Sequence, residues 1–257
     1  MSIDFDWSQT DVELLFIIPN YGRGDYIRKT IDNTLNTSVS KDKFVVLIIN
    51  DGIHEDFSDL KDKNVLYFTL ERNPACERNG GFSRNVAIKY SQSKLLAQRD
   101  PEILFTGDFI AGCFNNPNVL YRCGGIAHIT KQDQKNKFFG GIIDEKELIQ
   151  TSIKFPILEH QYVYWHYGHC LPISYFKKIN GYDEDFTLYG PEDHDMYDRL
   201  IKCELQPFFD KQCSPIHLWH GVPNTSHEDM KNVYRQKQKE SIIRNIGIDW
   251  GEGGIIK

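Results

Sequence analysis

Short apolar runs alternate with amphipathic stretches in the first half of the chain. Three runs are apolar at nearly every position, as in strands buried on both faces of a parallel sheet: 14–18, 44–49 and 65–70. Ile27, Ile31 and Leu35 recur every four residues and predict the buried face of a helix. A second helix is expected to begin near Gly81, and a fourth strand to cover 103–106. This order predicts an α/β fold with a mostly parallel central sheet flanked by helices.

The second half of the chain has a less regular pattern. We expect strands at 119–130 and 138–143, an alternating aromatic segment at 161–169, and helices at 191–203 and from 226 to about 245. No internal repeat and no linker stands out, so we expect a single domain.

Composition narrows the possible classes of function. The chain has 257 residues, with 30 Lys and Arg against 36 Asp and Glu, so its formal net charge is −6. Hydrophobic residues make up 40% and charged residues 26%, which argues against wholesale disorder. The negative charge argues against general nucleic-acid binding. No apolar run approaches the roughly 20 residues of a membrane span.

Targeting and redox signals favour a cytoplasmic protein. The first eleven residues are polar and acidic and have no signal-peptide core. Six cysteines are scattered without C-x-x-C spacing, which does not indicate a disulfide framework or a structural zinc site. We therefore expect a reducing compartment.

Polar clusters follow the predicted strands, where ligands bind in open α/β sheets. After the first strand, Gly22 lets the backbone approach a ligand and Arg23 can pair with phosphate. After the second, Asp51 can accept a hydrogen bond from a base edge. Each of these segments is also a common surface turn, so that interpretation stays open.

Two further positions fit a site for a diphosphate. Gly81 at a helix start offers free N–H groups to an anion, and Arg84 follows one turn later. Asp108 ends the predicted fourth strand, where a carboxylate can hold a divalent metal against a diphosphate. The alternatives are a tightly packed helix start and a solvated loop acid.

The second half adds acids and imidazoles. Glu192 and Asp193 lie at a predicted helix N-terminus, which favours the ionised form and suits a general base toward a sugar hydroxyl. The alternative is that they only favour helix initiation. His217 and His220 form an H-x-x-H, whose spacing can bring two imidazoles to one Mn²⁺ or Zn²⁺ ion. Packed or exposed histidines are the more common case.

Taken in order, these segments resemble the GT-A glycosyltransferases, in particular the large inverting family 2 type with a galactosyltransferase-like C-terminal segment. The resemblance covers about residues 14 to 220. It rests on seven segments, namely 16–23, 50–53, 79–85, 180–186, 190–193, 199–200 and His217. Each motif is only moderately specific, but their shared order is much stronger evidence than any one of them.

The resemblance implies a role for each matching residue. A nucleoside diphosphate-sugar donor would be bound by Pro19, Tyr21, Arg23, Asp51, Gly81, Arg84, Thr106 and Gly107. Mn²⁺ or Mg²⁺ would be held by Asp108 and His217, with Asp193 as catalytic base. Glu192 would help to hold a glycan or glycoconjugate acceptor. Apart from the resemblance, the aromatic rings of Trp165 and Tyr189 suggest a sugar acceptor. The domain would divide into a donor half at about 12–110, an acceptor half at about 111–225 and a helical tail at about 226–257.

The chain departs from the family pattern at two acids. Thr106 stands where the first carboxylate of Asp-x-Asp is expected, and Asn50 precedes Asp51 in place of an acid. These changes leave a non-catalytic nucleotide-sugar or glycan-binding protein as an alternative. A sugar-phosphate nucleotidylyltransferase is disfavoured, because 19–25 has one arginine and no lysine for a triphosphate. We expect an inverting, metal-assisted transferase, with UDP-sugar as the favoured donor.

Overall fold

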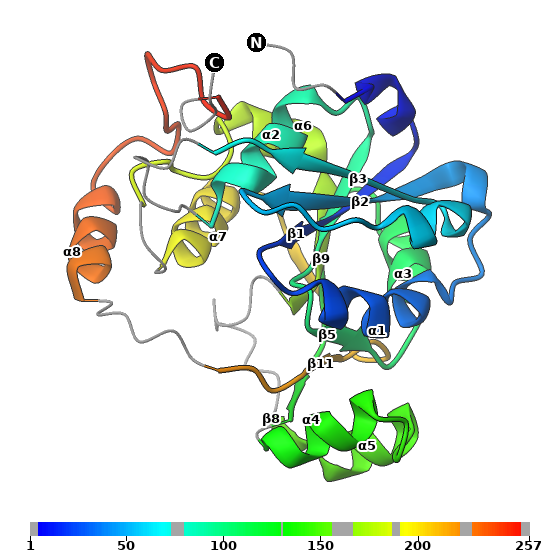
Figure 1. The fold of residues 1–257 in the computed structure, drawn as a ribbon. Helices are drawn as coiled ribbons and strands as arrows, with labels where there is room; N and C mark the ends of the chain where they lie inside the picture. The colour runs from blue at the N-terminus through cyan, green and yellow to red at the C-terminus, as the bar shows by residue number, and fades with distance from the viewer. Residues whose placement is uncertain are drawn as a thin grey trace.

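The structure is a computed structural model that describes residues 5–72, 80–129, 131–155, 167–186, 191–221 and 228–252. A seven-stranded sheet with the order β10-β6-β9-β4-β1-β2-β3 forms its centre (Figure 1). The strands are β1 (Leu14–Asn20), β2 (Phe44–Asp51), β3 (Val65–Leu70), β4 (Leu95–Gln98), β6 (Leu120–Cys123), β9 (His169–Pro172) and β10 (Pro207–Asp210). Only β9 runs antiparallel to its neighbours, so the predicted mostly parallel sheet is confirmed.

The two faces of the sheet bury alternate residues of the same strands. Leu15 and Ile17 face one hydrophobic core, and Leu14 and Phe16 face the other. The first core is covered by α2 (Phe82–Tyr90), α6 (Ile173–Lys178) and α7 (Glu192–Lys202). The second is covered by α1 (Gly24–Leu35) and α3 (Phe109–Asn115) (Figure 1). Short 3₁₀ turns are η1 (Trp7–Thr10), η2 (Lys41–Lys43) and η3 (Ser58–Lys63).

A smaller sheet with the order β5-β11-β7-β8 carries a third core (Figure 1). Its elements are β5 (Ile103–Phe105), β7 (Ile126–His128), α4 (Gln132–Phe139), α5 (Glu145–Thr151), β8 (Ile153–Phe155) and β11 (Pro215–His217). The strand expected at 138–143 is wrong, because those residues form the end of α4 and the turn after it.

The fourth parallel strand is β4, which lies beside β1, and not the segment 103–106. The apolar residues at 103–105 do form a strand, but β5 pairs with β11 in the smaller sheet. The four-residue strand Leu95–Gln98 thus takes the place of the fourth parallel strand that was expected at 103–106.

The tail begins with α8 (Glu228–Lys237), which ends earlier than the expected position near 245. The chain then returns without regular structure to pass over the end of the molecule near α2 (red in Figure 1). Within the described ranges, no helix is both long enough and apolar enough to span a bilayer. The cytoplasmic location stays a prediction.

Candidate active site

The carboxyl ends of β1 and β2 meet in a network of buried amides. The Asn20 Nδ2 atom donates to Asn50 Oδ1 at 2.8 Å and to Glu55 Oε2 at 2.6 Å. The Asn50 amide in turn donates to the Glu55 carbonyl at 2.7 Å, which a carboxylate at this position would not do. Asn20 Oδ1 accepts the Arg23 N–H at 3.0 Å and so fixes the start of α1.

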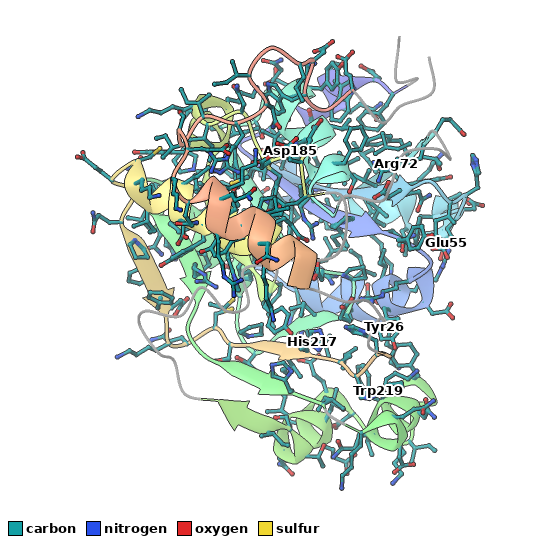
Figure 2. All side chains as sticks on the ribbon, turned by 90° about the vertical axis from the view of Figure 1, so that its left-hand side faces the viewer. Tyr26, Glu55, Arg72, Asp185, His217 and Trp219 are labelled. Carbon is teal, nitrogen blue, oxygen red and sulfur yellow. The ribbon has the colours of Figure 1, made fainter. Side chains whose placement is uncertain are left out.

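Asp51 ends β2 and is almost fully buried. Its carboxylate lies 3.0 Å from the Arg72 guanidinium, which also stacks over the Phe82 ring at 4.6 Å. Figure 2 shows Arg72 and Glu55 on the same side of the molecule, beyond the ends of β2 and β3. Asp51 thus stands at the predicted strand end, next to the start of α2.

The turn after β4 carries two acids, Asp100 and Glu102. Arg99, fully buried, donates to the carbonyls of Asp100 and Pro101 at 2.9 and 3.0 Å, and to the Thr30 hydroxyl at 3.0 Å. The Thr30 hydroxyl donates to the Pro101 carbonyl, also at 3.0 Å. Burial lowers the pKa of Arg99 to about 9, although Glu102 and Asp100 favour its charge. Arg99 therefore braces the turn from inside the protein.

Glu102 stands at the centre of a cluster with two histidines. Its Oε1 atom lies 3.0 Å from His220 Nε2 and 3.5 Å from His217 Nε2, and it also pairs with Arg23. The ligand atoms of the three residues lie within 4.8 Å of one another. The Glu102 side chain is 2% exposed, so this carboxylate is held inside the protein.

The chemistry of this cluster fits a divalent metal. Burial raises the pKa of Glu102, but hydrogen bonds from His217 and His220 and the charge of Arg23 together hold it well below the usual value. Glu102 is therefore ionised. Its second oxygen, Oε2, is buried and has no hydrogen-bond partner among the described residues. A carboxylate with one unused oxygen beside two imidazoles is a donor set that suits Mn²⁺ or Zn²⁺.

Two neighbouring elements position the histidines. His217 is the last residue of β11, where it pairs with Ile103 of β5. The Tyr26 hydroxyl on α1 donates to the Trp219 carbonyl at 2.9 Å, between the two histidines. Figure 2 shows Tyr26, Trp219 and His217 close together between the main body and the α4–α5 unit.

The start of α2 joins this cluster to the acids of α7. Arg84 is buried and lies 2.7 Å from Asp100. A Cβ atom on Gly81 would stand 2.4 Å from the Tyr182 side chain, and one on Gly80 would stand 2.8 Å from Glu192 Oε1. Glycine is therefore needed for α2 to start this close to the loop before α7.

Glu192 and Asp193 begin α7 on the side that faces Arg84. Burial lowers the pKa of Arg84, but Asp100, Tyr182, Asp193 and Glu192 together raise it above its usual value. The guanidinium thus remains charged in a largely acidic surrounding. Arg84 and Asp100 therefore link the predicted base, Asp193, to the cluster at Glu102.

The structure separates Asp108 from His217, contrary to the expectation that they share a metal. Asp108 caps α3 by accepting the Ala111 N–H at 2.9 Å, and it accepts the Ser38 N–H at 2.7 Å. In the β5–β11 ladder, His217 pairs with Ile103, whereas Asp108 lies beyond the opposite end at Phe105. Glu102 takes the place beside His217.

Thr106 and Gly107, expected beside the donor, also lie at that far end of the ladder. Thr106 exchanges hydrogen bonds with Ser214, and a Cβ on Gly107 would meet the Gln212 carbonyl at 2.7 Å. Pro19 and Tyr21 do lie at the end of β1, where Tyr21 is 50% exposed. The expected acceptor residues Trp165 and Tyr189 lie outside the described residues.

The residues missed as site members are Asn20, Glu55, Arg99, Asp100 and Glu102. Glu102 carried a signal, because Asp100-Pro101-Glu102 places two acids at i and i+2 shortly after the apolar run 95–97. Proline at the middle position also disfavours continuation of a strand. His220 was visible as part of H-x-x-H, but nothing in the sequence placed it beside Glu102.

Comparison with known proteins supports the fold described above. A family model described as the N-terminal domain of galactosyltransferase matches residues 152–227. Staphylococcus aureus TarS 1-349 in complex with UDP-GlcNAc superimposes with a TM-score of 0.62 at 14% identity, covering 88% of this chain and 65% of that one. The chain has a GT-A glycosyltransferase fold. The mannosyltransferase PcManGT from Pyrobaculum calidifontis with GDP-Man and Mn²⁺ matches this GT-A chain with a TM-score of 0.52 at 12% identity, covering 93% and 64% of the two chains.

Two curated proteins are similar in sequence to this GT-A chain. Mouse chondroitin sulfate synthase 3 is 24% identical over 239 residues, which are 84% of this chain and 26% of that protein. An uncharacterized glycosyltransferase from Rickettsia bellii is 34% identical over 100 residues, covering 37% and 14% of the two. The chain thus spans about a quarter or less of the curated relatives it matches.

Proposed function

We propose that this chain transfers a sugar from a UDP-sugar donor to a hydroxyl group of a glycan acceptor, with inversion at the anomeric carbon. One observation carries the proposal: Glu102, His217 and His220 form a cluster at the turn after β4, and Asp100 of the same turn pairs with Arg84 of α2. The solved structure of GalNAc-T7 with UDP, GalNAc and Mn²⁺ has a similar fold, with a TM-score of 0.58. It supports a nucleotide-sugar donor and a metal here.

Mn²⁺ or Mg²⁺ would be held by Glu102, His217 and His220. Two imidazole ligands favour Mn²⁺, because Mg²⁺ is usually held by oxygen ligands. When bound, the ion would act as a Lewis acid that stabilises the negative charge of the leaving diphosphate. The alternative of a non-catalytic protein rested on Thr106 as a missing acid, and Glu102 offers a carboxylate for the metal in its place.

The donor would be oriented by residues at the ends of β1, β2 and α2. Arg84 lies in the first turn of α2 and keeps its charge, so it is suited to pair with a phosphate oxygen. Asp51 would accept the uracil N–H, and its ion pair with Arg72 would hold the carboxylate in place. The amide network around Asn20 and Asn50 would keep the carboxyl ends of β1 and β2 rigid.

Asp193 would act as the general base. It would take the proton of the acceptor hydroxyl while that oxygen bonds to the anomeric carbon and the bond from that carbon to the diphosphate oxygen breaks. Glu192, which stands against Gly80, would help to hold the acceptor. The position of both acids at the N-terminus of α7 supports this role, because the helix dipole favours the ionised carboxylate.

The replacement Asp193→Asn tests the base. Because general-base catalysis contributes about 10²–10⁴-fold, we expect turnover of a UDP-sugar to fall by that factor while UDP binding measured by calorimetry stays unchanged. Asp198→Asn on the same helix is the matched control, since Asp198 contacts Tyr234 and Gln238 of the tail. Normal turnover by Asp193→Asn would refute the assignment, and NMR of the product anomer would test inversion.

The donor base and the metal can be identified together. A thermal-shift screen of UDP, GDP and TDP with and without Mn²⁺ should show the largest stabilisation for UDP with Mn²⁺, since stabilisation grows as RT ln(1 + [L]/Kd). Equal shifts for the three nucleotides would argue against a role for Asp51 in base recognition. A UDP shift that Mn²⁺ does not increase would argue against metal-assisted binding.

A further inference from the structure

Two asparagine side chains, from different parts of the chain, hydrogen-bond to the backbone of the loop at 180–186. Asn85 on α2 accepts the Tyr182 N–H at 2.7 Å and donates to the Tyr182 carbonyl at 2.9 Å. Asn245 in the tail donates to the same carbonyl and to the Asn180 carbonyl, both at 2.8 Å, and accepts the Glu184 N–H at 3.0 Å. The loop backbone is thus fixed both by the donor side of the molecule and by the tail.

The tail segment 241–252, which we name the strap, also reaches α7 directly. Arg244 is buried, and its guanidinium lies 2.9 Å from Asp183 of the loop and 3.2 Å from Asp195 in the first turn of α7. Arg199 of α7 donates to the Ile242 carbonyl at 3.5 Å and to the Gly181 carbonyl at 2.8 Å. These contacts tie the strap, the loop and the start of α7 together.

The end of the strap is anchored on α2. The Gly251 N–H donates to Glu184 Oε1 at 2.6 Å, and Lys89 pairs with Glu252 at 2.7 Å. Gly181 has φ +67°, and a Cβ atom there would stand 2.3 Å from Asn85 Oδ1 and 3.0 Å from the Trp250 ring. Only glycine fits between α2 and the strap at this position.

We propose that the strap is a positioning element for catalysis, in which Asn245 and Arg244 hold the 180–186 loop and the start of α7 so that Glu192 and Asp193 face the donor site. This inference rests on the proposed function for the roles of those two acids. The strap touches the 180–186 loop, α2, α7 and Ile179 just after α6, and the contacts in the described part of the chain include none with Glu102, His217 or His220. A loss of the strap should therefore affect turnover more than donor binding.

The variant Asn245→Gly isolates the side chain, because Asn245 has φ 54° and glycine adopts this left-handed conformation without strain. Asn64→Gly is the matched control. Asn64 also has a positive φ, of 66°, and donates to the Lys41 carbonyl at 2.9 Å, but it precedes β3 on another part of the sheet. Both variants lose one amide side chain from a left-handed turn.

Hydrogen exchange followed by mass spectrometry gives a readout that is independent of activity. In Asn245→Gly, we expect peptides covering 180–186 to exchange about tenfold faster, because the Glu184 N–H loses its acceptor and two carbonyls lose a donor. Asn64→Gly should leave these peptides unchanged. Equal exchange in Asn245→Gly and the parent chain would overturn the proposal.

Kinetics then test positioning. With a UDP-sugar and Mn²⁺, Asn245→Gly should lower kcat about tenfold while the Kd for UDP measured by calorimetry changes less than about twofold. An unchanged kcat with faster loop exchange would overturn the catalytic role of the strap. A parent chain that binds UDP but transfers no sugar to any acceptor tested would defeat the proposed function, and the exchange comparison would still decide whether the strap holds the loop.

Discussion

The turns at 100–102 and 106–108 follow consecutive strands, and each presents a buried or half-buried carboxylate. Glu102 of the first turn meets His217, His220 and Arg23, and keeps one buried oxygen without a partner in the described structure. Asp108 of the second turn uses its oxygens to accept N–H groups from Ala111 and Ser38. The Glu102 carboxylate is therefore suited to bind a ligand, whereas the Asp108 carboxylate stabilises the fold.

The difference follows from the sheet to which each strand belongs. β4 runs parallel to β1 in the central sheet, so its carboxyl end reaches the edge where α1 and α2 begin. β5 runs antiparallel to β11, so its carboxyl end points away from His217, which pairs with the first residue of β5. Two acids six positions apart in the sequence are thus placed at opposite ends of a three-residue ladder.

The largest effect is expected from removing the charge of Glu102. Glu102→Gln keeps the size of the side chain but loses an anionic ligand, so Mn²⁺ affinity should fall more than about 100-fold, since even outer ligand partners are worth 10–100-fold. Sugar transfer at fixed Mn²⁺ should fall with it. Mn²⁺ binding followed by electron paramagnetic resonance measures the first effect without any acceptor.

The control is the equivalent change in the other turn, Asp108→Asn. An asparagine still caps a helix, so we expect Mn²⁺ affinity and turnover to change less than about threefold. The reverse result, with Asp108→Asn losing the metal and Glu102→Gln keeping it, would overturn the distinction between the two turns.

Replacing Arg99 removes the buried hydrogen bonds that hold the turn at 100–102. Arg99→Met removes the donors to the Asp100 and Pro101 carbonyls and to Thr30, so each of these buried acceptors loses one hydrogen bond. We expect a loss of about 2 kcal/mol in the free energy of unfolding, within the range of about 1–3 kcal/mol for such groups. Urea denaturation measures this loss, and Mn²⁺ affinity should fall as well because Glu102 is less well placed. An unchanged affinity would show that the turn keeps its shape without Arg99.

The sequence predicted the central sheet well because the pattern there is strong. The runs beginning at Leu14 and Phe44 are long, apolar and bounded by polar turns, and the structure buries every one of their core positions. The helix containing Ile27 and Ile31 was predicted correctly because its buried residues recur at helical spacing in the sequence. Predictions were therefore confirmed where a strand is buried on both faces, because such a strand needs apolar residues at many consecutive positions.

The prediction that Asp108 lies beside His217 failed because the segment 103–106, and not Leu95–Gln98, was taken as the fourth parallel strand. Leu95–Gln98 ends in glutamine, whereas the three residues Ile103–Phe105 are wholly apolar, so the local pattern favoured the wrong segment. Pairing partners decide the matter, and they are set by long-range packing that a single sequence does not record. The position of His220 was lost for the same reason.

A smaller effect, on stability alone, is expected from Asp108→Ala. Loss of an N-cap should lower the free energy of unfolding by about 1 kcal/mol at pH 7. Burial raises the pKa of Asp108, but N–H groups of Ala111 and Ser38 together lower it below its usual 3.8. The carboxylate therefore stabilises the fold above pH 3.8, and this contribution is lost as the pH falls further. Denaturation curves at pH 7 and pH 3 should show a smaller difference between variant and parent at pH 3.

The smallest effect concerns the hydroxyl that supports this cap. The Ser38 hydroxyl donates to Asp108 Oδ2 at 3.0 Å in an exposed position, so Ser38→Ala should cost about 0.5 kcal/mol and leave Mn²⁺ affinity unchanged. In the Asp108→Ala background the same replacement should cost almost nothing, because its partner is absent. A double-mutant cycle by urea denaturation measures this coupling. Additive costs would mean that the hydroxyl does not act through Asp108, and a loss of metal affinity would mean that the second turn reaches the site after all.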